Sequence, residues 1–253
     1  MENKEPSFLD LLLEVHIGLE RQGPGSPEAV QQALRFLEPL DRFGKAADLG
    51  CGTGGQTMLL AERLPGTVVG LDMFPDFIEK LNRTAKAAGC EGRVKGVVGK
   101  MEDLPFEKGS LDLIWSEGAI DNIGFREGLR HWRSFLREGG YVAVSCPSWL
   151  TNEHPSEVEQ FWTDAGSRLD PVETNIGILQ DCGYAFVAAF ALPEECWTKH
   201  YFDPREQAIQ KALEKYPQSE TAKQYAALNR REVELYLNGN QHYGYVFYIG
   251  KAI

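Results

Sequence analysis

The chain has 253 residues, of which 43% are hydrophobic and 25% charged, and its formal net charge is −11 at pH 7. That balance is typical of a globular protein and excludes a disordered or collagen-like chain. The sequence contains no run of about 20 apolar residues, which is the length that a membrane-spanning helix needs. The five cysteines lack the spacing of a zinc site or a disulfide framework. An acidic chain argues against a nucleic-acid partner, because phosphate binding depends on Lys and Arg.

Residues 1–43 are expected to form a helical segment ahead of the main domain. The apolar run of residues 8–15 is interrupted by acidic residues, which predicts a short amphipathic helix instead of a secretory signal. A cytoplasmic protein is therefore expected. Ser26 followed by Pro27 is typical of a helix start. Glycines in residues 20–26 would suit a hinge, so this segment is either a lid over the site or a plain turn before a capped helix.

Strand-like and helix-like runs alternate through the middle of the chain, which predicts βαβ units and a parallel sheet. Two further strand-like runs follow closer to the C-terminus. The seven predicted strands are residues 46–49, 67–71, 93–98, 111–115, 141–146, 185–192 and 243–249. Helices with apolar residues at helical spacing should separate them, and one of these is expected to end at Gly139 and Gly140.

The carboxy-terminal part contains two further helix starts, at Asp170 and Asp203, each followed by proline and then an acid two residues later that would complete a reciprocal cap. The second opens a helical region over residues 203–239, which Pro217 should divide in two. This region lies between the last two predicted strands and is far longer than a hairpin loop of ~2–5 residues. It is interpreted as a cap over a substrate site or a homodimer contact, with an extra structural helix pair as the alternative.

The most informative sequence, Asp-Leu-Gly-Cys-Gly-Thr-Gly-Gly, occupies residues 48–55 between a predicted strand and a predicted helix. Ligands of open α/β sheets bind at such turns, at the carboxyl edge of the strands. Glycine lets the backbone press against a ligand there. The spacing alone is shared with dinucleotide-binding folds. Asp72, at the end of the next strand, stands where a carboxylate can accept hydrogen bonds from ribose hydroxyls.

These residues resemble the motifs of a known protein family. Residues 48–54 closely resemble the first motif of class I S-adenosylmethionine-dependent methyltransferases. Residues 68–73 resemble their second strand, and residues 99–120 resemble the loop and fourth strand of the small-molecule branch that includes ubiquinone/menaquinone biosynthesis enzymes. The resemblance covers residues 44–147. It implies an α/β, Rossmann-like, seven-stranded and mostly parallel sheet, with helices on both faces and an antiparallel last strand, in a methyltransferase domain over residues 44–253.

The resemblance also implies S-adenosyl-L-methionine as the cofactor, without a metal, and it assigns residues to it. Backbone at the glycine turn should approach the methionine and ribose portions. Asp48 should help to order that turn near the methionine end, and Asp72 should hold the ribose. The expected cofactor residues are Asp48, Gly50, Gly52, Gly54, Gln56, Asp72, Met73, Met101, Glu102 and Glu117. Lys100 stands where the family often has an acid. Because lysine cannot accept a hydrogen bond from the adenine amino group, Glu102 is expected to take that role.

The acceptor is harder to read than the cofactor. The resemblance implies a small-molecule acceptor and places Ser116 and Glu117 in the cleft between cofactor and substrate. Weak catalytic candidates are Glu117, His200 and Tyr201. Other side chains that could contact an acceptor, each with an equally plain packing or surface role, are Asp121, Trp149, His154, Trp197 and Tyr243. Two rivals stay open: an NAD-dependent oxidoreductase that uses the same turn, and a cofactor-binding protein without turnover.

Overall fold

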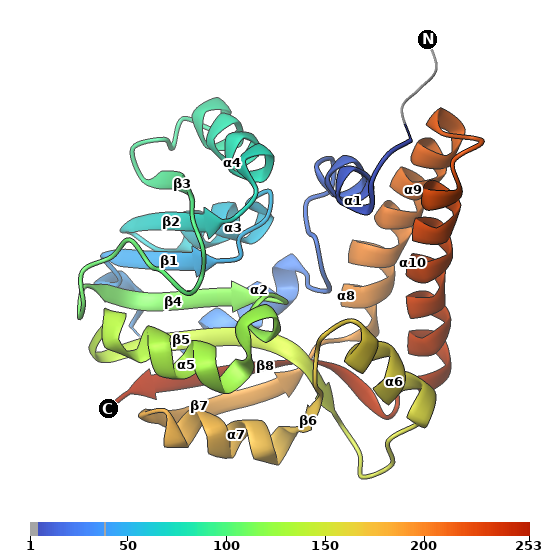
Figure 1. The fold of residues 1–253 in the computed structure, drawn as a ribbon. Coiled ribbons are helices and arrows are strands. Elements are labelled where there is room, and N and C mark those ends of the chain that lie inside the picture. The colour runs from blue at the N-terminus through green and yellow to red at the C-terminus, as the bar shows by residue number, and fades with distance from the viewer. Residues whose placement is uncertain (1–4, 38) are drawn as a thin grey trace.

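The structure is a computed structural model that describes residues 5–37 and 39–253. A single mixed sheet has the strand order β3-β2-β1-β4-β5-β8-β7, with the short β6 paired to β5 (Figure 1). The strands are β1 (Lys45–Leu49), β2 (Thr67–Asp72), β3 (Val94–Val98), β4 (Leu111–Glu117), β5 (Leu136–Trp149), β6 (Asp170–Pro171), β7 (Tyr184–Ala191) and β8 (Tyr243–Ala252). β8 runs antiparallel to both β5 and β7, which confirms the predicted antiparallel last strand.

Helices cover both faces of this sheet. Buried side chains of α2, α3 and α4 pack on one face, and those of α5 and α7 pack on the other. The α-helices are α1 (Phe8–His16), α2 (Pro27–Leu34), α3 (Gly55–Arg63), α4 (Pro75–Ala87), α5 (Phe125–Trp132), α6 (Ser156–Asp164), α7 (Val172–Asp181), α8 (Glu194–Trp197), α9 (Asp203–Lys215) and α10 (Glu220–Gly239). The short 3-10 and π segments are η1 (Leu40–Arg42), η2 (Ile120–Ile123), η3 (Arg133–Phe135) and η4 (Thr198–Phe202).

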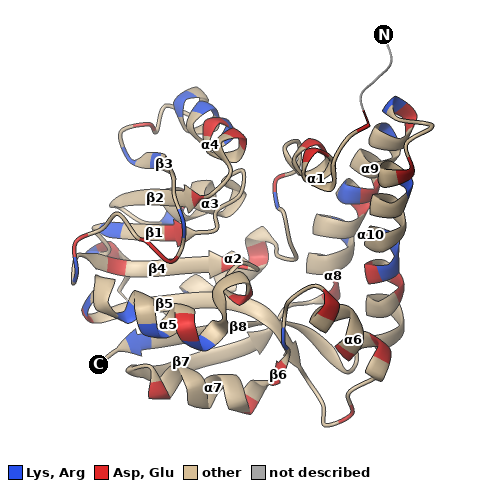
Figure 2. Ribbon diagram, in the orientation of Figure 1, with Lys and Arg blue, Asp and Glu red and all other residues tan. Residues whose placement is uncertain are grey.

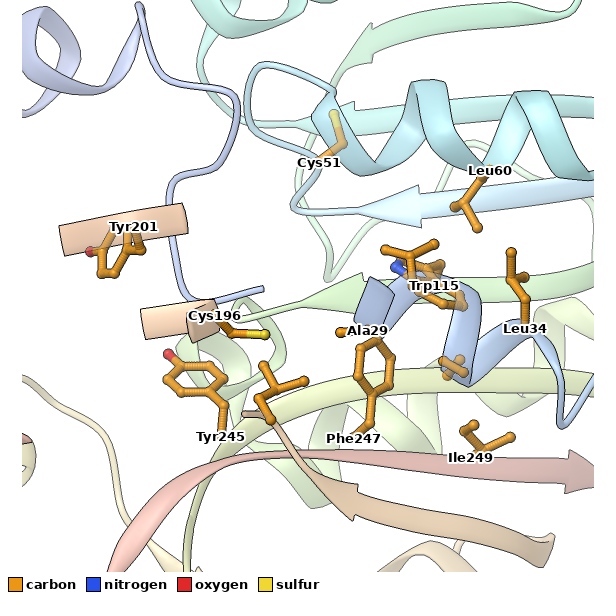
Figure 3. Close-up of a cluster of buried hydrophobic side chains, with 14 of the residues drawn as sticks. Ala29, Leu34, Cys51, Leu60, Trp115, Cys196, Tyr201, Tyr245, Phe247 and Ile249 are labelled. Atoms are coloured by element: carbon orange, nitrogen blue, oxygen red, sulfur yellow. The ribbon is translucent and has the colours of Figure 1, made fainter. Parts of the chain in front are cut away.

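The period of two along each strand divides the core between the two faces. On β4, Trp115 belongs to the cluster under α2 and α3, whereas its neighbour Ile114 belongs to the cluster under α5 and α7. Figure 3 shows Trp115 between Leu60 of α3 and Phe247 of β8, and the rings of Trp115 and Phe247 lie 5.1 Å apart. The fully buried central strands account for the nearly continuous apolar runs in the sequence.

The helix start predicted at Asp170 is wrong. Asp170 and Pro171 form β6, which pairs in parallel with Ser148 and Trp149 at the end of β5, and α7 begins only at Val172. The sheet therefore has eight strands instead of the predicted seven. Extended backbone is favoured for a residue that precedes proline, and here that backbone lies within reach of an existing strand.

The helix predicted to end at Gly139 and Gly140 also ends earlier. α5 stops at Trp132, and both glycines belong to β5. A side chain at Gly140 would lie 3.2 Å from the carbonyl oxygen of Leu111 and 3.0 Å from that of Arg137. Glycine is needed here because the backbone is crowded where the chain enters β5. These glycines therefore do not mark the end of a helix.

The region of residues 203–239 is helical and is divided around Pro217, as predicted, because α9 ends before it and α10 begins after it. The reciprocal cap expected at Asp203 is absent, since Phe202 before it is already in right-handed helical conformation. The chain therefore enters α9 directly from η4, and no free helix end exists there to cap.

The helices α1, α9 and α10 stand side by side next to the carboxyl ends of the parallel strands (Figure 1). Leu11 and Val15 of α1 are buried against Ile209 of α9 and Tyr225 of α10, in a cluster separate from those on the sheet. Across the residues that the structure describes, no helix combines the length and apolarity needed to traverse a bilayer.

Candidate functional site

A cavity of about 550 Å³ lies where the carboxyl ends of β1, β2 and β4 face α1. Its size falls in the range of small-molecule sites, ~300–1,000 Å³. Much of its wall comes from the ends of β2 and β4 and from the loops that follow β1, β2, β3 and β4. The rest comes from α3, α4 and η2, and from α1 and the segment after it. The lining residues are Leu12, His16, Arg21, Gln22, Gly23, Pro24, Gly50, Gly52, Gln56, Asp72, Met73, Phe74, Phe77, Gly99, Lys100, Met101, Glu102, Glu117, Gly118, Ala119, Asn122 and Ile123.

The glycine-rich turn brings bare backbone to this cavity. Gly50 and Gly52 have φ values of 70° and 54°, which side-chain-bearing residues rarely adopt. A side chain at Gly50 would collide with Ala119, since their β-carbons would lie 2.4 Å apart. The turn leads directly into α3, whose first backbone N–H groups have no partner inside the helix. This wall of the cavity therefore consists of polar backbone groups, and the N-terminus of α3 behind it carries a partial positive charge.

Asp72 closes the turn from the tip of β2. Its Oδ2 accepts a hydrogen bond from the backbone N–H of Gly52 at 2.9 Å, and its Oδ1 accepts one from that of Phe74 at 3.0 Å. Burial raises the pKa of Asp72, while these backbone hydrogen bonds counteract the rise. The side chain is held in one orientation and lines the cavity, with lone pairs left for a ligand hydroxyl.

Eight of the ten predicted cofactor residues line the cavity; Asp48 and Gly54 do not. Asp48 lies behind the turn, where its Oδ2 accepts a 2.6 Å hydrogen bond from Thr57 and its Oδ1 has no partner. Burial, aided by the negative charge of Glu117, raises the pKa of Asp48 to about 8. Gly54 packs on Leu81, whose Cδ1 would lie 2.3 Å from an added β-carbon. Both residues shape the turn from the side away from the cavity.

The other end of the cavity combines sulfur, aromatic and charged groups. Met73 is 58% exposed and lines the cavity beside Phe77 of α4. Met101 is anchored from behind, because its carbonyl oxygen accepts a hydrogen bond from Trp132 Nε1 at 3.0 Å. Lys100 also lines this end. This end of the cavity therefore offers apolar contact surface to a ligand.

The segment after α1 contributes a buried ion pair. Arg21 Nη1 donates to Glu117 Oε2 at 2.7 Å, and both side chains are almost fully buried. Trp115 Nε1 donates to the other oxygen of Glu117 at 2.8 Å. Gly25 permits this approach, because a β-carbon there would lie 2.6 Å from Arg21 Nη1. Arg21 Nη2 is enclosed by protein atoms and has no hydrogen-bond partner among the described residues.

The same segment is attached to the glycine-rich turn through Gln22. Its Oε1 accepts from the backbone N–H of Thr53 at 3.0 Å, and its Nε2 donates to Thr53 Oγ1, also at 3.0 Å. Thr53 Oγ1 in turn donates to the carbonyl oxygen of Leu19 at 2.8 Å. A β-carbon at Gly52 would lie 1.8 Å from Gln22 Oε1. Residues far apart in the sequence thus form one wall.

The predicted catalytic candidates separate in space. Glu117 lines the cavity, but His200 and Tyr201 do not. Tyr201 belongs to the core under the carboxy-terminal helices, where its hydroxyl accepts a 2.7 Å hydrogen bond from Arg205 Nη1. Burial raises the pKa of Tyr201 far above its ordinary value. The structure therefore does not bring a base to the cavity from this part of the chain.

The remaining acceptor candidates also lie elsewhere. Trp149 and His154 stack at 4.3 Å between ring centres and line a second hollow of about 470 Å³ beside α6. Trp197 and Tyr243 are buried in the hydrophobic core. Asp121 is partly buried and accepts a 2.8 Å hydrogen bond from Ser167. None of these residues lines the larger cavity.

The sequence offered the N-terminal segment as a lid or a plain turn, but it did not single out the side chains that line the cavity. These are Leu12, His16, Arg21 and Gln22. Arg21 and Gln22 reach partners 96 and 31 residues away in sequence. Residues 203–239, interpreted as a cap or a homodimer contact with a structural helix pair as the alternative, contribute no residue to this lining; α9 and α10 pack against α1, which does.

Comparison with known proteins agrees with this arrangement. Residues 46–140 match the family model of the methyltransferase domain. Among curated proteins, the geranyl diphosphate 2-C-methyltransferase of Streptomyces lasalocidi is 31% identical over 113 residues, which are 44% of this chain and 38% of that protein. The trans-aconitate 2-methyltransferase of Deinococcus radiodurans is 34% identical over 126 residues, which are 49% of this chain and 45% of that protein. Each match spans less than half of the relative.

Solved structures extend the likeness to nearly the whole chain. A SAM-dependent methyltransferase from Geobacter sulfurreducens, solved with S-adenosyl-L-homocysteine, superposes with a TM-score of 0.81 at 18% identity, over 96% of this chain and 98% of that one. One from Thiobacillus denitrificans, solved with the same compound, gives 0.80 at 20% identity, over 98% and 99%. At these identities the likeness concerns the fold. Residues 46–140 are thus similar in sequence to a methyltransferase domain and to small-molecule methyltransferases, and the chain shares the fold of solved SAM-dependent methyltransferases.

Proposed function

We propose that this protein is a methyltransferase that binds S-adenosyl-L-methionine in the 550 Å³ cavity and transfers its methyl group to a small molecule. The observation that carries the proposal is the joint presence, on one wall, of the glycine-rich turn and of Asp72 at the tip of the next strand. The sequence relatives named for methylation of small molecules support the acceptor class.

The residues of this cavity fit an adenosyl sulfonium. Backbone at Gly50 and Gly52 offers the uncluttered surface that the ribose and methionine portions need, and Asp72 would accept hydrogen bonds from ribose hydroxyls. Met73 and Met101 would contact the adenine ring, with Glu102 at its edge. Arg21, which belongs to the cavity lining, would suit an anionic group of either ligand.

The cofactor, when bound, supplies an electrophilic methyl group on a positively charged sulfur, with a neutral thioether as leaving group. The chain has to align the acceptor behind that methyl and to exclude water. Leu12, Ala119 and Ile123 line the cavity with apolar surface. Because positive charge is dispersed as the methyl is transferred, such a site favours the transition state over bulk water.

The segments that flank the site have separate proposed roles. Residues 1–43 would form a lid, since α1 and the following turn line the cavity and attach to the glycine turn through Gln22. Residues 203–239 would act as a support for that lid, because α9 and α10 bury the outer face of α1. Three statements stay predictions from the sequence. These are a homodimer contact through α9 and α10, the absence of a nucleic-acid partner, and a cytoplasmic site of action.

Calorimetry with S-adenosyl-L-methionine tests the cofactor assignment. Asp72→Ala should weaken binding by about 2–3 kcal/mol, the value of charge-assisted hydrogen bonds to a carboxylate. Glu79→Ala, which removes an exposed acid of the adjacent α4, should leave the affinity unchanged. Equal affinities of the wild type and a folded Asp72→Ala protein would contradict the role of Asp72.

Turnover is tested by incubating the protein with deuteromethyl cofactor and a small-molecule extract of cells. A deuterated product found by mass spectrometry is the expected result. Cofactor binding without any labelled product would instead favour a binding protein without turnover, and a change in nicotinamide absorbance would favour the oxidoreductase alternative.

A further inference from the structure

His16, the last residue of α1, is a buried titratable group that has no part in the cofactor contacts proposed above. Only 7% of its surface is exposed. It lines the same cavity as the glycine turn and Glu117, to which α1 otherwise contributes only Leu12. An imidazole is the commonest proton acceptor in enzyme sites. Its position therefore raises the question of which ring nitrogen is available to a ligand.

The hydrogen bonding of the ring answers that question. His16 Nδ1 lies 2.9 Å from the backbone carbonyl oxygen of Leu12. A carbonyl oxygen only accepts hydrogen bonds, so Nδ1 must carry the hydrogen. In a neutral ring Nε2 then has a free lone pair. Among the described residues, no side chain or backbone group donates to Nε2, and Nε2 is not among the fully enclosed polar atoms that lack a partner.

The surroundings keep the ring neutral. Burial, aided by the positive charge of Arg205 on α9, lowers the pKa of His16 to about 4, although the hydrogen bond to Leu12 opposes this. Arg205 is itself paired with Glu232 of α10. The other charged side chains that line the cavity around His16 are Arg21, Asp72, Lys100, Glu102 and Glu117.

The other carboxylates of the cavity are less suited to accept a proton. Both oxygens of Glu117 already accept hydrogen bonds, from Arg21 and Trp115. Both oxygens of Asp72 accept backbone hydrogen bonds, and the proposed ribose contact uses this residue as well. Glu102 is exposed at the end assigned to adenine. His16 is thus the buried cavity group that combines a neutral state with an unused lone pair.

We propose that His16 Nε2 is the catalytic proton acceptor of the methyl transfer, and that the acceptor substrate presents a hydroxyl group to it. This inference rests on the proposed methyltransferase function. The hydroxyl oxygen attacks the methyl carbon, a C–O bond forms, and the C–S bond breaks with its electron pair left on the sulfur of the thioether. The hydroxyl proton moves to Nε2, and the imidazolium later releases it to water.

A neutral imidazole with a free lone pair on Nε2 suits a hydroxyl acceptor. A weak base cannot ionise a free hydroxyl, whose pKa is ~10 even in a phenol. As the C–O bond forms, however, the same oxygen becomes positively charged and its proton becomes strongly acidic, so a weak base suffices in concert with transfer. An ammonium group would keep its proton against such a base, and a carboxylate or thioether has no proton to lose.

The matched variants are His16→Asn and His131→Asn. An asparagine amide at position 16 can still donate to the carbonyl oxygen of Leu12, as Nδ1 does, but it offers no basic nitrogen. His131 lies exposed on α5, outside the cavity, and its replacement controls for the loss of a histidine. Cofactor affinity is measured by calorimetry with S-adenosyl-L-homocysteine, and turnover by mass spectrometry with deuteromethyl cofactor and small-molecule extract.

The expected results are a label on oxygen of the product, a loss of ~100-fold or more in kcat for His16→Asn, and unchanged affinity for S-adenosyl-L-homocysteine. His131→Asn should match the wild type. A label on nitrogen, carbon, sulfur or a carboxylate, or full kcat in His16→Asn, overturns this inference and leaves the proposed function standing. Absence of both cofactor binding and labelled product overturns the proposed function and this inference with it.

The state of the ring is tested independently of turnover by nitrogen-15 NMR of the histidine side chains, assigned with His16→Asn. At neutral pH, His16 should show hydrogen on Nδ1 and none on Nε2, and it should titrate well below the ordinary range of a histidine side chain. A protonated ring at neutral pH, or hydrogen on Nε2 alone, contradicts the proposal.

Discussion

Asp48 shows how a buried acid can shape a binding turn. The family resemblance predicts that Asp48 helps to order the glycine turn and lies near the methionine end of the cofactor, and the structure places it behind that turn, bonded to Thr57. Its second oxygen is buried without a partner. A carboxylate in such a place is costly in its charged form. Asp48 therefore acts on the turn as a neutral group at neutral pH, since its pKa is raised to about 8.

This environment makes stability depend on pH. Folding raises the pKa of Asp48 from 3.8 to about 8, so the folded state binds its proton more tightly than the unfolded state. The resulting stability is complete at low pH and is lost as the pH rises through that interval. Asp48→Asn carries no such proton. Its unfolding free energy relative to the wild type should rise by about 2–3 kcal/mol between roughly pH 6 and pH 8.

Urea denaturation of both proteins at these two pH values measures the difference, and Asp41→Asn, on the exposed η1, is the matched control. A constant difference between Asp48→Asn and the wild type across the pH interval would show that Asp48 is ionised in the folded protein at neutral pH.

Among the elements of the fold, α1 both packs against the carboxy-terminal helices and lines the cavity. Leu11 and Val15 pack on α9 and α10, and His16 lines the cavity, while Leu12 contributes to both. The amphipathic spacing of residues 8–15 predicted the helix but not its partners. The exposed Leu9 lies outside both contacts. The docking of α1 on α9 and α10 therefore determines whether this wall of the cavity is present.

Truncation of Leu11 should loosen that wall. Leu11 is fully buried, and Leu→Ala at such positions costs about 2–5 kcal/mol. We expect faster hydrogen exchange at the amides of α1 in Leu11→Ala, and a slower methyl transfer, with the sheet amides unaffected. Leu9→Ala, at a leucine that is 52% exposed, should exchange like the wild type. Equal protection of α1 in both variants would mean that the helix does not depend on this cluster.

The elements of the sheet were readable to different extents. The strands at residues 46–49 and 67–71 were found almost to the residue, because their apolar runs end at the glycine turn and at Asp72. β6 was not found, because a two-residue strand has no hydrophobic period and exists only where Asp170 meets the end of β5. The start of β5 was also missed, because its glycines favoured a helix end when read without the neighbouring strand.

Across the whole molecule, charge and support are arranged around the cavity. Figure 2 shows acidic segments at the tips of β1, β2 and β4, which face α1, and mixed basic and acidic segments along α9 and α10. Lys215 of α9 donates to both oxygens of Glu14 on α1, at 2.8 and 2.9 Å. The carboxy-terminal helices thus hold the N-terminal helix against the sheet by apolar and polar contacts together.

Replacement of residues 203–239 by a short flexible linker tests this support. The loops that carry the glycine turn and Asp72 do not depend on α9 and α10 for their hydrogen bonds, so cofactor binding should persist. Turnover should be abolished, because α1 loses its partners and uncovers the cavity. Calorimetry and the deuteromethyl assay measure the two properties. Loss of both, with an unfolded protein by circular dichroism, would make the region a requirement of the fold.

The sequence by itself determined the α/β class, the antiparallel last strand, the division of the 203–239 region at Pro217, and the wall built by Gly50, Gly52 and Asp72. These depend on periodicity and on short-range backbone chemistry, which neighbouring residues carry. Only the tertiary structure decided that Arg21 meets Glu117, that His16 lines the cavity, and that His200 and Tyr201 do not. Such contacts depend on how distant elements pack, and no local pattern encodes a distance between them.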